Sequence, residues 1–179
     1  MKLIRLDNDA SSLIIGIKKI YIENPRSFLE KLRERFPSLT IQALDANFIA
    51  GYEHLKSILY QSWTAFKRDI SYSKKLDLEL IVRMACDSQI NRALKIVGLK
   101  SGIMNLAIVA MGDQRNLKLF AEDIKSLGEI SESVLKLTPK KENFLIEHHD
   151  LSSKLLQSTI SYKNKLAAIL SEKANLLRI

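Results

Sequence analysis

The chain has 179 residues, 46% of them hydrophobic, which is enough for one well-buried core with at most a small appendage. Its 28 lysines and arginines outnumber 20 acidic residues, and the formal net charge of +8 favours an anionic partner over a cationic one. A single cysteine excludes an internal disulfide and no apolar stretch approaches the ~20 residues of a membrane-spanning helix, so we expect a single domain over residues 1–179 in the cytoplasm.

The first elements are predicted to be a strand, a short helix and a second strand. Residues 13–22 are rich in isoleucine and end just before Asn24 and Pro25, two residues typical of a helix start. The helix would end before Pro37. Residues 39–44 then alternate between apolar and polar or small side chains, which predicts the second strand.

Three helical patterns follow one another between residues 51 and 98. The first has one apolar stripe, and the second is apolar around most of its circumference, which is typical of a largely buried helix. The third stops at Gly98, a residue suited to a left-handed cap. We expect these helices to stack at the centre of the protein. Their apolar positions are Leu55, Ile58, Leu59, Trp63 and Phe66, then Leu78, Leu80, Ile81, Val82, Met84, Ala85 and Cys86, then Ile90, Ala93, Leu94 and Val97.

Two more strands and further helices are expected in the second half of the chain. Residues 103–111 form an aliphatic run bounded by glycines, as in a central strand, and Asp113 can cap the helix after it. Residues 131–137 are predicted as a fourth strand, and Thr138 opens another helix. One helix over all the remaining residues would be on the order of 60 Å long, so we place a break within residues 148–152.

The order of these elements defines the expected fold class. It is α/β (α+β), with a mixed central sheet of about four strands packed with helices. The helices include the three consecutive ones and a C-terminal helix. The pairing of the strands does not follow from the sequence.

Residue sets that carry catalysis are absent from the sequence. The six glycines are scattered rather than gathered into a phosphate-binding loop. The adjacent His148 and His149 would point about 100° apart on a helix and do not form a metal face. Cys86 lies among apolar residues, which is typical of a small buried side chain rather than a nucleophile. We therefore expect no catalytic residues, no cofactor and no metal.

A basic segment between the first two central helices is the main candidate for binding an anion. It contains Lys67, Arg68, Lys74 and Lys75, with Tyr72 among them. Lysine and arginine neutralise phosphates and an aromatic ring can stack on an unpaired base, so these five residues suit single-stranded RNA. A charged loop that only keeps the protein soluble is the alternative.

Five segments carry a family resemblance: GYEHL at 51–55, AFKR at 65–68, LDLELI at 76–81, QINRALKIVG at 89–98 and LSEKANLL at 170–177. They resemble the PRPK-binding subunit family of the KEOPS complex. The departures are Asp69 and Ser71, where the family has glycine and asparagine, and Asp87 and Ser88, where it often has a basic pair. The resemblance therefore does not imply an RNA contact at positions 87 and 88 of this chain.

The resemblance implies a non-catalytic regulatory subunit. Such a subunit binds the small kinase-like ATPase subunit of KEOPS, stimulates it, and helps recruit tRNA through its single-stranded 3′ CCA end for threonylcarbamoyl-adenosine modification. The expected partners are thus a kinase-like protein and tRNA, with no membrane and no DNA. A stand-alone basic RNA-binding module and an enzyme with an unrecognised small-molecule site stay open as alternatives.

The terminal helix is expected to carry the partner surface, with help from the first central helix. Its apolar residues occupy more than one face, and a monomer rarely leaves such a patch exposed without a use. One face can bury against the sheet, while Ile169, Leu176 and Ile179 are left over for a second surface. The candidate partner-binding residues are Leu166, Ile169, Leu170, Lys173, Leu176 and Leu177.

Overall fold

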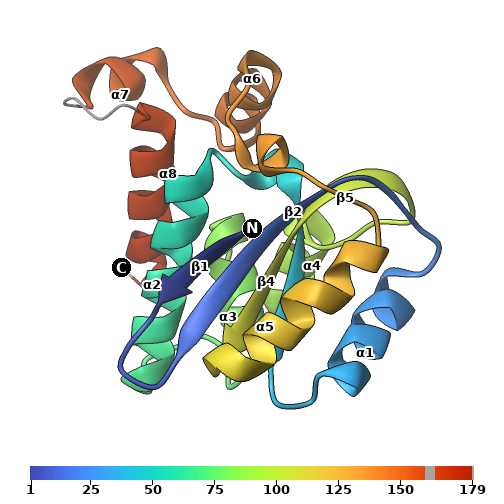
Figure 1. Ribbon diagram of the computed structural model, residues 1–179. Coiled ribbons are helices and arrows are strands. Elements are labelled where there is room, and N and C mark those ends of the chain that lie inside the picture. Colours follow the sequence, from blue (N-terminus) through green and yellow to red (C-terminus); the bar gives the residue numbers. More distant parts are fainter. Residues whose placement is uncertain (160–163, 179) are drawn as a thin grey trace.

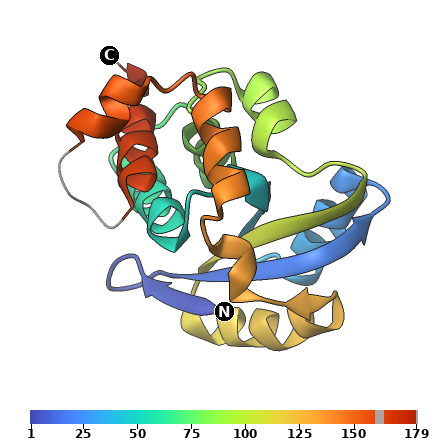
Figure 2. The same ribbon diagram turned by 90° about the horizontal axis from the view of Figure 1, so that it is seen from above.

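The structure is a computed structural model that describes residues 1–159 and 164–178. A five-stranded sheet lies between two groups of helices (Figures 1 and 2). The strands are β1 (Lys2–Arg5), β2 (Ser11–Ile22), β3 (Thr40–Asp45), β4 (Gly102–Gly112) and β5 (Glu129–Ile130). The helices are α1 (Pro25–Arg35), α2 (Tyr52–Lys67), α3 (Leu76–Ala85), α4 (Ile90–Val97), α5 (Gln114–Asp123), α6 (Pro139–His148), α7 (Ser153–Ser158) and α8 (Lys165–Asn175). Short 3-10 turns are η1 (Ala46–Phe48), η2 (Ile124–Ser126), η3 (Glu132–Leu135) and η4 (Leu176–Arg178).

The sheet has the strand order β1-β2-β4-β3, and β5 pairs with part of β2. The expected α+β class is confirmed. Every pairing among the described strands is antiparallel, however, so the sheet is not mixed as expected. The three long strands were predicted from their apolar patterns, whereas β1 and β5 were not.

The two faces of the sheet support separate cores because successive side chains of a strand point to opposite sides. In β4, Leu106 and Ile108 pack toward α1 and α5, while Ala107 and Val109 pack toward the other helices. Figure 2 shows α1 and α5 on one face, and α2, α3, α4, α6 and α8 on the other.

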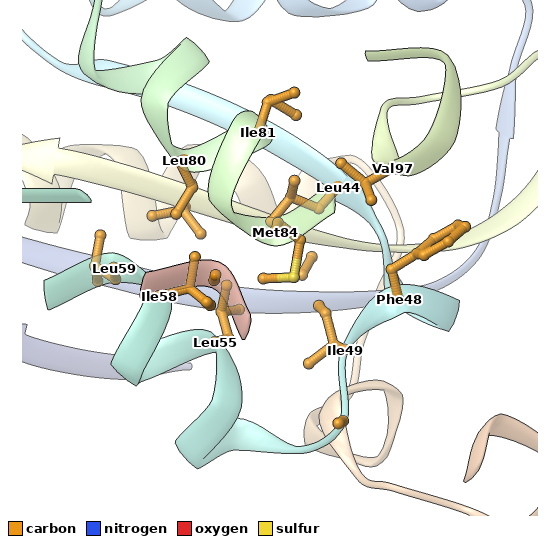
Figure 3. Packing of buried hydrophobic residues seen from close by; sticks show 14 of the residues in the cluster. Leu44, Phe48, Ile49, Leu55, Ile58, Leu59, Leu80, Ile81, Met84 and Val97 are labelled. Atoms are coloured by element: carbon orange, nitrogen blue, oxygen red, sulfur yellow. The ribbon is translucent and has the colours of Figure 1, made fainter. Parts of the chain in front are cut away.

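The larger core is built from the three helices that follow β3. The prediction that α2, α3 and α4 pack together is confirmed, and α3 is buried around most of its surface, as expected. Figure 3 shows how side chains of these helices and of η1 interdigitate over β3. The labelled residues are Leu44, Phe48, Ile49, Leu55, Ile58, Leu59, Leu80, Ile81, Met84 and Val97.

Short polar side chains begin five of the described helices. Each accepts a hydrogen bond from the backbone N–H three residues further on, which satisfies one of the free donors of the first turn. The residues are Asn24 for α1, Asp113 for α5, Thr138 for α6, Ser152 for α7 and Asn164 for α8. Asn24, Asp113 and Thr138 were predicted from the sequence, and Ser152 lies within the predicted break. Asn164 was not predicted, because one final helix was expected after the break instead of α7 and α8.

Two local predictions are wrong. Gly98 has φ −73°, so it is not a left-handed cap. It is required instead by a close approach, because a Cβ there would lie 2.4 Å from the carbonyl oxygen of Leu94. Residues 131–137 do not form a strand: Ser131 donates its backbone N–H to the carbonyl of Gly16 at 2.9 Å, and the chain then turns into η3.

Candidate functional site

The basic segment lies at the C-terminal end of α2 and in the loop leading to α3. Arg68, Lys74 and Lys75 are exposed there, and none of the three forms a salt bridge within the described residues. Lys67 is also exposed, with its Nζ 3.9 Å from a carboxylate oxygen of Asp7 and 5.4 Å from the ring centre of Trp63. The structure thus brings the four predicted basic residues together on one end of the molecule.

Tyr72 does not project from this loop as a stacking residue would. Its side chain is half-buried and packs against the larger core, and its backbone N–H donates to Oε2 of Glu79 at 2.7 Å. Phe66, at the end of α2, is the more exposed aromatic ring, with 37% of its surface accessible.

Glu79 and Arg83 form a buried ion pair that joins this loop to the terminal helix. Arg83 Nε donates to Glu79 Oε1 at 2.8 Å, and both side chains are buried. The second carboxylate oxygen of Glu79 accepts the backbone N–H groups of Tyr72 and Ser73. Arg83 Nη1 lies 3.5 Å from the carbonyl oxygen of Ala174 in α8. The loop and α8 are therefore fixed by one pair of charges.

Position 87 has a structural role at the start of α4. Asp87 accepts the backbone N–H of Gln89 at 2.9 Å and pairs with the side chain of Arg92. The hydrogen bond from Arg92 is the main cause that lowers the pKa of the Asp87 carboxyl. The residue that stands where the family often has a basic side chain thus organises the helix start.

The terminal helix α8 packs against α2 and α3 (Figure 1) rather than mainly on the sheet. Leu166 and Leu170 were candidate partner-binding residues, but both are buried there in the larger core and offer no surface to a partner. The expectation that Ile169 belongs to an uncovered surface is wrong, because only 6% of that residue is accessible. Ile179 lies outside the described residues.

The remaining candidate residues of the partner surface lie near the end of α8. Leu176 has 49% of its surface accessible, and Leu177 is half-buried against the larger core. Lys173 is exposed, although its Nζ donates to the carbonyl oxygen of His149 at 3.0 Å. Leu176 is thus the apolar candidate that the chain itself leaves most exposed.

A groove of about 420 Å³ runs between α2 and the end of α8. Gln61 bridges the two helices by donating to the carbonyl oxygen of Ser171 at 2.9 Å. Ile70, which is 43% accessible, lies at this groove, and Leu176 follows Asn175 beside it. The sequence did not single out the groove, since its α2 residues are polar or small and carry no apolar period. They are Ser57, Tyr60, Gln61, Thr64 and Ala65, joined by Arg68, Ile70, Arg83 and Asn175.

Cys86 is a packing residue, as the sequence predicted. Its Sγ lies 3.7 Å from the carbonyl oxygen of Leu170, and burial raises the pKa of the thiol to about 11. Its backbone adopts the left-handed conformation that ends α3. Within the described residues, the histidines, cysteine and carboxylates form no group of three that could hold a metal ion.

Comparisons with known proteins agree on one family. The model of the family described as kinase binding protein CGI-121 matches residues 20–162. The chain is also 32% identical over 109 residues to the regulatory protein Cgi121 of Methanocaldococcus jannaschii, covering 61% of this chain and 69% of that protein. The resemblance to kinase-binding subunits is thereby confirmed. No helix in the described part of the chain is long and apolar enough to cross a membrane.

Proposed function

This chain belongs to the CGI-121 kinase-binding family, and from that premise we propose that it is a regulatory subunit that binds and stimulates the kinase-like ATPase subunit of the KEOPS complex. Its named relative is itself called a regulatory protein. The same complex modifies tRNA, and this subunit would help to recruit it. The proposal places the chain in the complex as a binding subunit, without chemistry of its own.

The groove between α2 and α8 is the observation that carries the kinase contact. Ile70 lines the groove and remains exposed, and the exposed Leu176 directly follows Asn175, which also lines it; a partner at the groove would bury Ile70 and extend to Leu176. Arg68 adds a positive charge beside them. The family match includes α2 but ends at residue 162, so the contribution of α8 rests on its packing beside α2.

Co-purification with the kinase-like subunit tests this surface. Ile70→Asp and Leu176→Asp should each weaken binding roughly tenfold or more, because a charge then enters an apolar contact. Leu119→Asp is the matched control, since Leu119 is 56% accessible on α5, on the other face of the molecule. Circular dichroism and the melting midpoint should stay near those of the parent for all three variants.

Two results would count against the groove. Parent-like binding by both Ile70→Asp and Leu176→Asp would place the contact elsewhere, and an equal loss in Leu119→Asp would show a non-specific effect of charge. Ile169→Asp is not suitable for this test, because Ile169 is buried and a charge there would destabilise the fold itself.

The proposed tRNA contact is the exposed basic segment. Phosphate contacts release counterions, so affinity should fall as the salt concentration rises. Reversing Lys67, Lys74 and Lys75 should weaken binding and reduce the slope of log K against log salt by roughly 2 for a single-stranded contact. Arg68 is left unchanged because it also lines the groove.

The control for the tRNA test reverses three basic residues on the opposite face, Lys31, Arg115 and Lys118, which are exposed on α1 and α5. It should retain the parent slope. If the variant of the basic segment binds tRNA as tightly as the parent does, the segment is only a solvated surface. A preference for tRNA that lacks its CCA end would also contradict the proposed mode.

A further inference from the structure

A second concave surface lies away from the groove, where η1, η3, the start of β4 and the start of α6 meet. It encloses about 500 Å³, which is within the range of small-molecule sites in proteins. Neither the partner groove nor the basic segment contributes a residue to it. Its lining consists of Asp45, Asn47, Phe48, Lys100, Asn105, Ser133, Val134, Lys136, Thr138, Lys140, Lys141 and Phe144.

The charges in this cleft are strongly one-sided, with four lysines and one carboxylate. Lys100 lies 3.2 Å from Asp45, which neutralises one positive charge. Lys136 and Lys140 are exposed and form no salt bridge within the described residues. Two lysine side chains are therefore available to an anion, with Lys100 close to them.

Lys141 adds positive charge to the cleft without offering it a free donor. Its Nζ donates to the carbonyl oxygens of Ile49, Val134 and Lys136 at 3.2, 2.8 and 3.1 Å. Burial lowers the pKa of this lysine to about 8, so it is still charged in neutral solution. Backbone carbonyls hold the charged Lys141 side chain in place, and its electric field acts on any ligand that enters the cleft.

The lining of the cleft also contains two aromatic rings. The rings of Phe48 and Phe144 meet edge to face with their centres 5.1 Å apart, and Lys100 lies 5.3 Å from the ring centre of Phe48. Val134 extends the apolar surface, and Asn47 adds an amide group. The cleft thus combines aromatic rings with basic side chains, which is a different pattern from that of a charged surface loop.

We propose that this cleft binds a free nucleotide, with the phosphate among Lys100, Lys136 and Lys140 and the base against Phe144. Lysine neutralises phosphate as a point charge, and an aromatic ring stacks on the π-face of any base. The lining residues Asp45, Asn47 and Phe48 lie before the start of α2, whereas the basic segment lies at its other end, and a helix of 16 residues is about 24 Å long. The proposal is therefore independent of the proposed kinase and tRNA contacts.

Calorimetric titration of the full chain with AMP tests the proposal, with adenosine and inorganic phosphate as partial ligands. AMP should bind saturably and more tightly than either part, and its affinity should fall as salt is added. Lys136→Glu with Lys140→Glu should weaken AMP binding by roughly tenfold or more, because the phosphate loses two charged partners. Phe144→Ala should reduce the advantage of AMP over inorganic phosphate.

The control reverses two exposed basic residues on α5, Arg115→Glu with Lys118→Glu, and changes the net charge by the same amount. It should bind AMP as the parent does. An equal loss in the control, equal affinities for AMP and inorganic phosphate, or no saturable binding of AMP would each overturn the proposal. Binding of an RNA oligonucleotide, but not of AMP, at this cleft would overturn it as well.

Discussion

His54 is a fully buried histidine whose charge state should contribute to the response of the protein to acid. Its Nδ1 accepts the backbone N–H of Ala50 at 3.2 Å, and its Nε2 has no hydrogen-bond partner in the described part of the chain. Burial lowers the pKa of His54 from 6.5 to about 3, with smaller contributions from His149 and Lys141. The neutral ring is therefore the form that the folded protein holds.

The free energy of unfolding should consequently fall on mild acidification. The pKa of His54 is lower in the folded protein than in the unfolded chain. Its contribution to the free energy of unfolding is therefore complete above the unfolded pKa of 6.5 and is lost as the pH falls below it. When the pH falls from about 7.5 to about 5.5, protonation of His54 should lower the free energy of unfolding by about 1.4 kcal/mol. Urea unfolding at the two pH values measures the total change, to which His149 also contributes because burial lowers its pKa to about 4.

A substitution at the same position isolates this effect. His54→Asn keeps an acceptor for Ala50 but does not titrate, so the variant should lose less stability over the same pH interval, whatever its stability near pH 7.5. His148→Asn is the comparison, since His148 lies on the surface of α6. A parent protein that is equally stable at both pH values would contradict the assignment.

Single residues were predicted well where a short local pattern decides their role. Asp113 and Thr138 were predicted to begin helices, and Cys86 to be a packing residue, because neighbours in the sequence determine these roles. Tyr72 and Ile169 were not placed correctly. Their burial depends on α3, α2 and α8 coming together, which the local pattern does not contain.

At the level of elements, Glu79 is expected to hold the basic loop and α8 in place. Glu79→Gln would leave Arg83 buried without its charged partner and weaken the contacts to Tyr72 and Ser73. Breaking one half of a buried ion pair costs roughly 3–5 kcal/mol. Urea unfolding should show a loss of this size, and trypsin should cleave faster after Lys74 and Lys75 because their loop is less restrained.

Glu53→Gln provides the matched control on the neighbouring helix. Glu53 is exposed and pairs with Lys56 at 3.8 Å, so its loss should cost less than ~1 kcal/mol. A Glu79→Gln protein with parent stability and parent proteolysis would show that the pair does not restrain the loop.

The elements that the sequence identified are those with long apolar patterns. Strand β1 was missed because it is four residues long and has a charged residue at each end. The stretch 131–137 was taken as a strand, yet it turns into η3 because it passes closely over Gly16, where a Cβ would lie 2.5 Å from the carbonyl oxygen of Ser131. Such a close approach between segments over a hundred residues apart leaves no local signal.

For the whole molecule, the arrangement of layers separates two kinds of surface. The helices α1 and α5 cover one face of the sheet (Figure 2). The groove, the basic segment and the lysine-lined cleft are formed by segments on or around the other face. The groove and the basic segment meet at Arg68, so a kinase-like partner and tRNA could be held next to each other. Exposed residues on the face covered by α1 and α5 provide the positions of the control variants for the binding tests.

Hydrogen exchange of the chain, free and bound to the kinase-like subunit, tests the central proposal most directly. We expect slower exchange on binding in α2, in the loop around Ile70 and at the C-terminal end of α8, with α1 and α5 unchanged. Protection confined to α1 and α5, with none in α2 or α8, would contradict it.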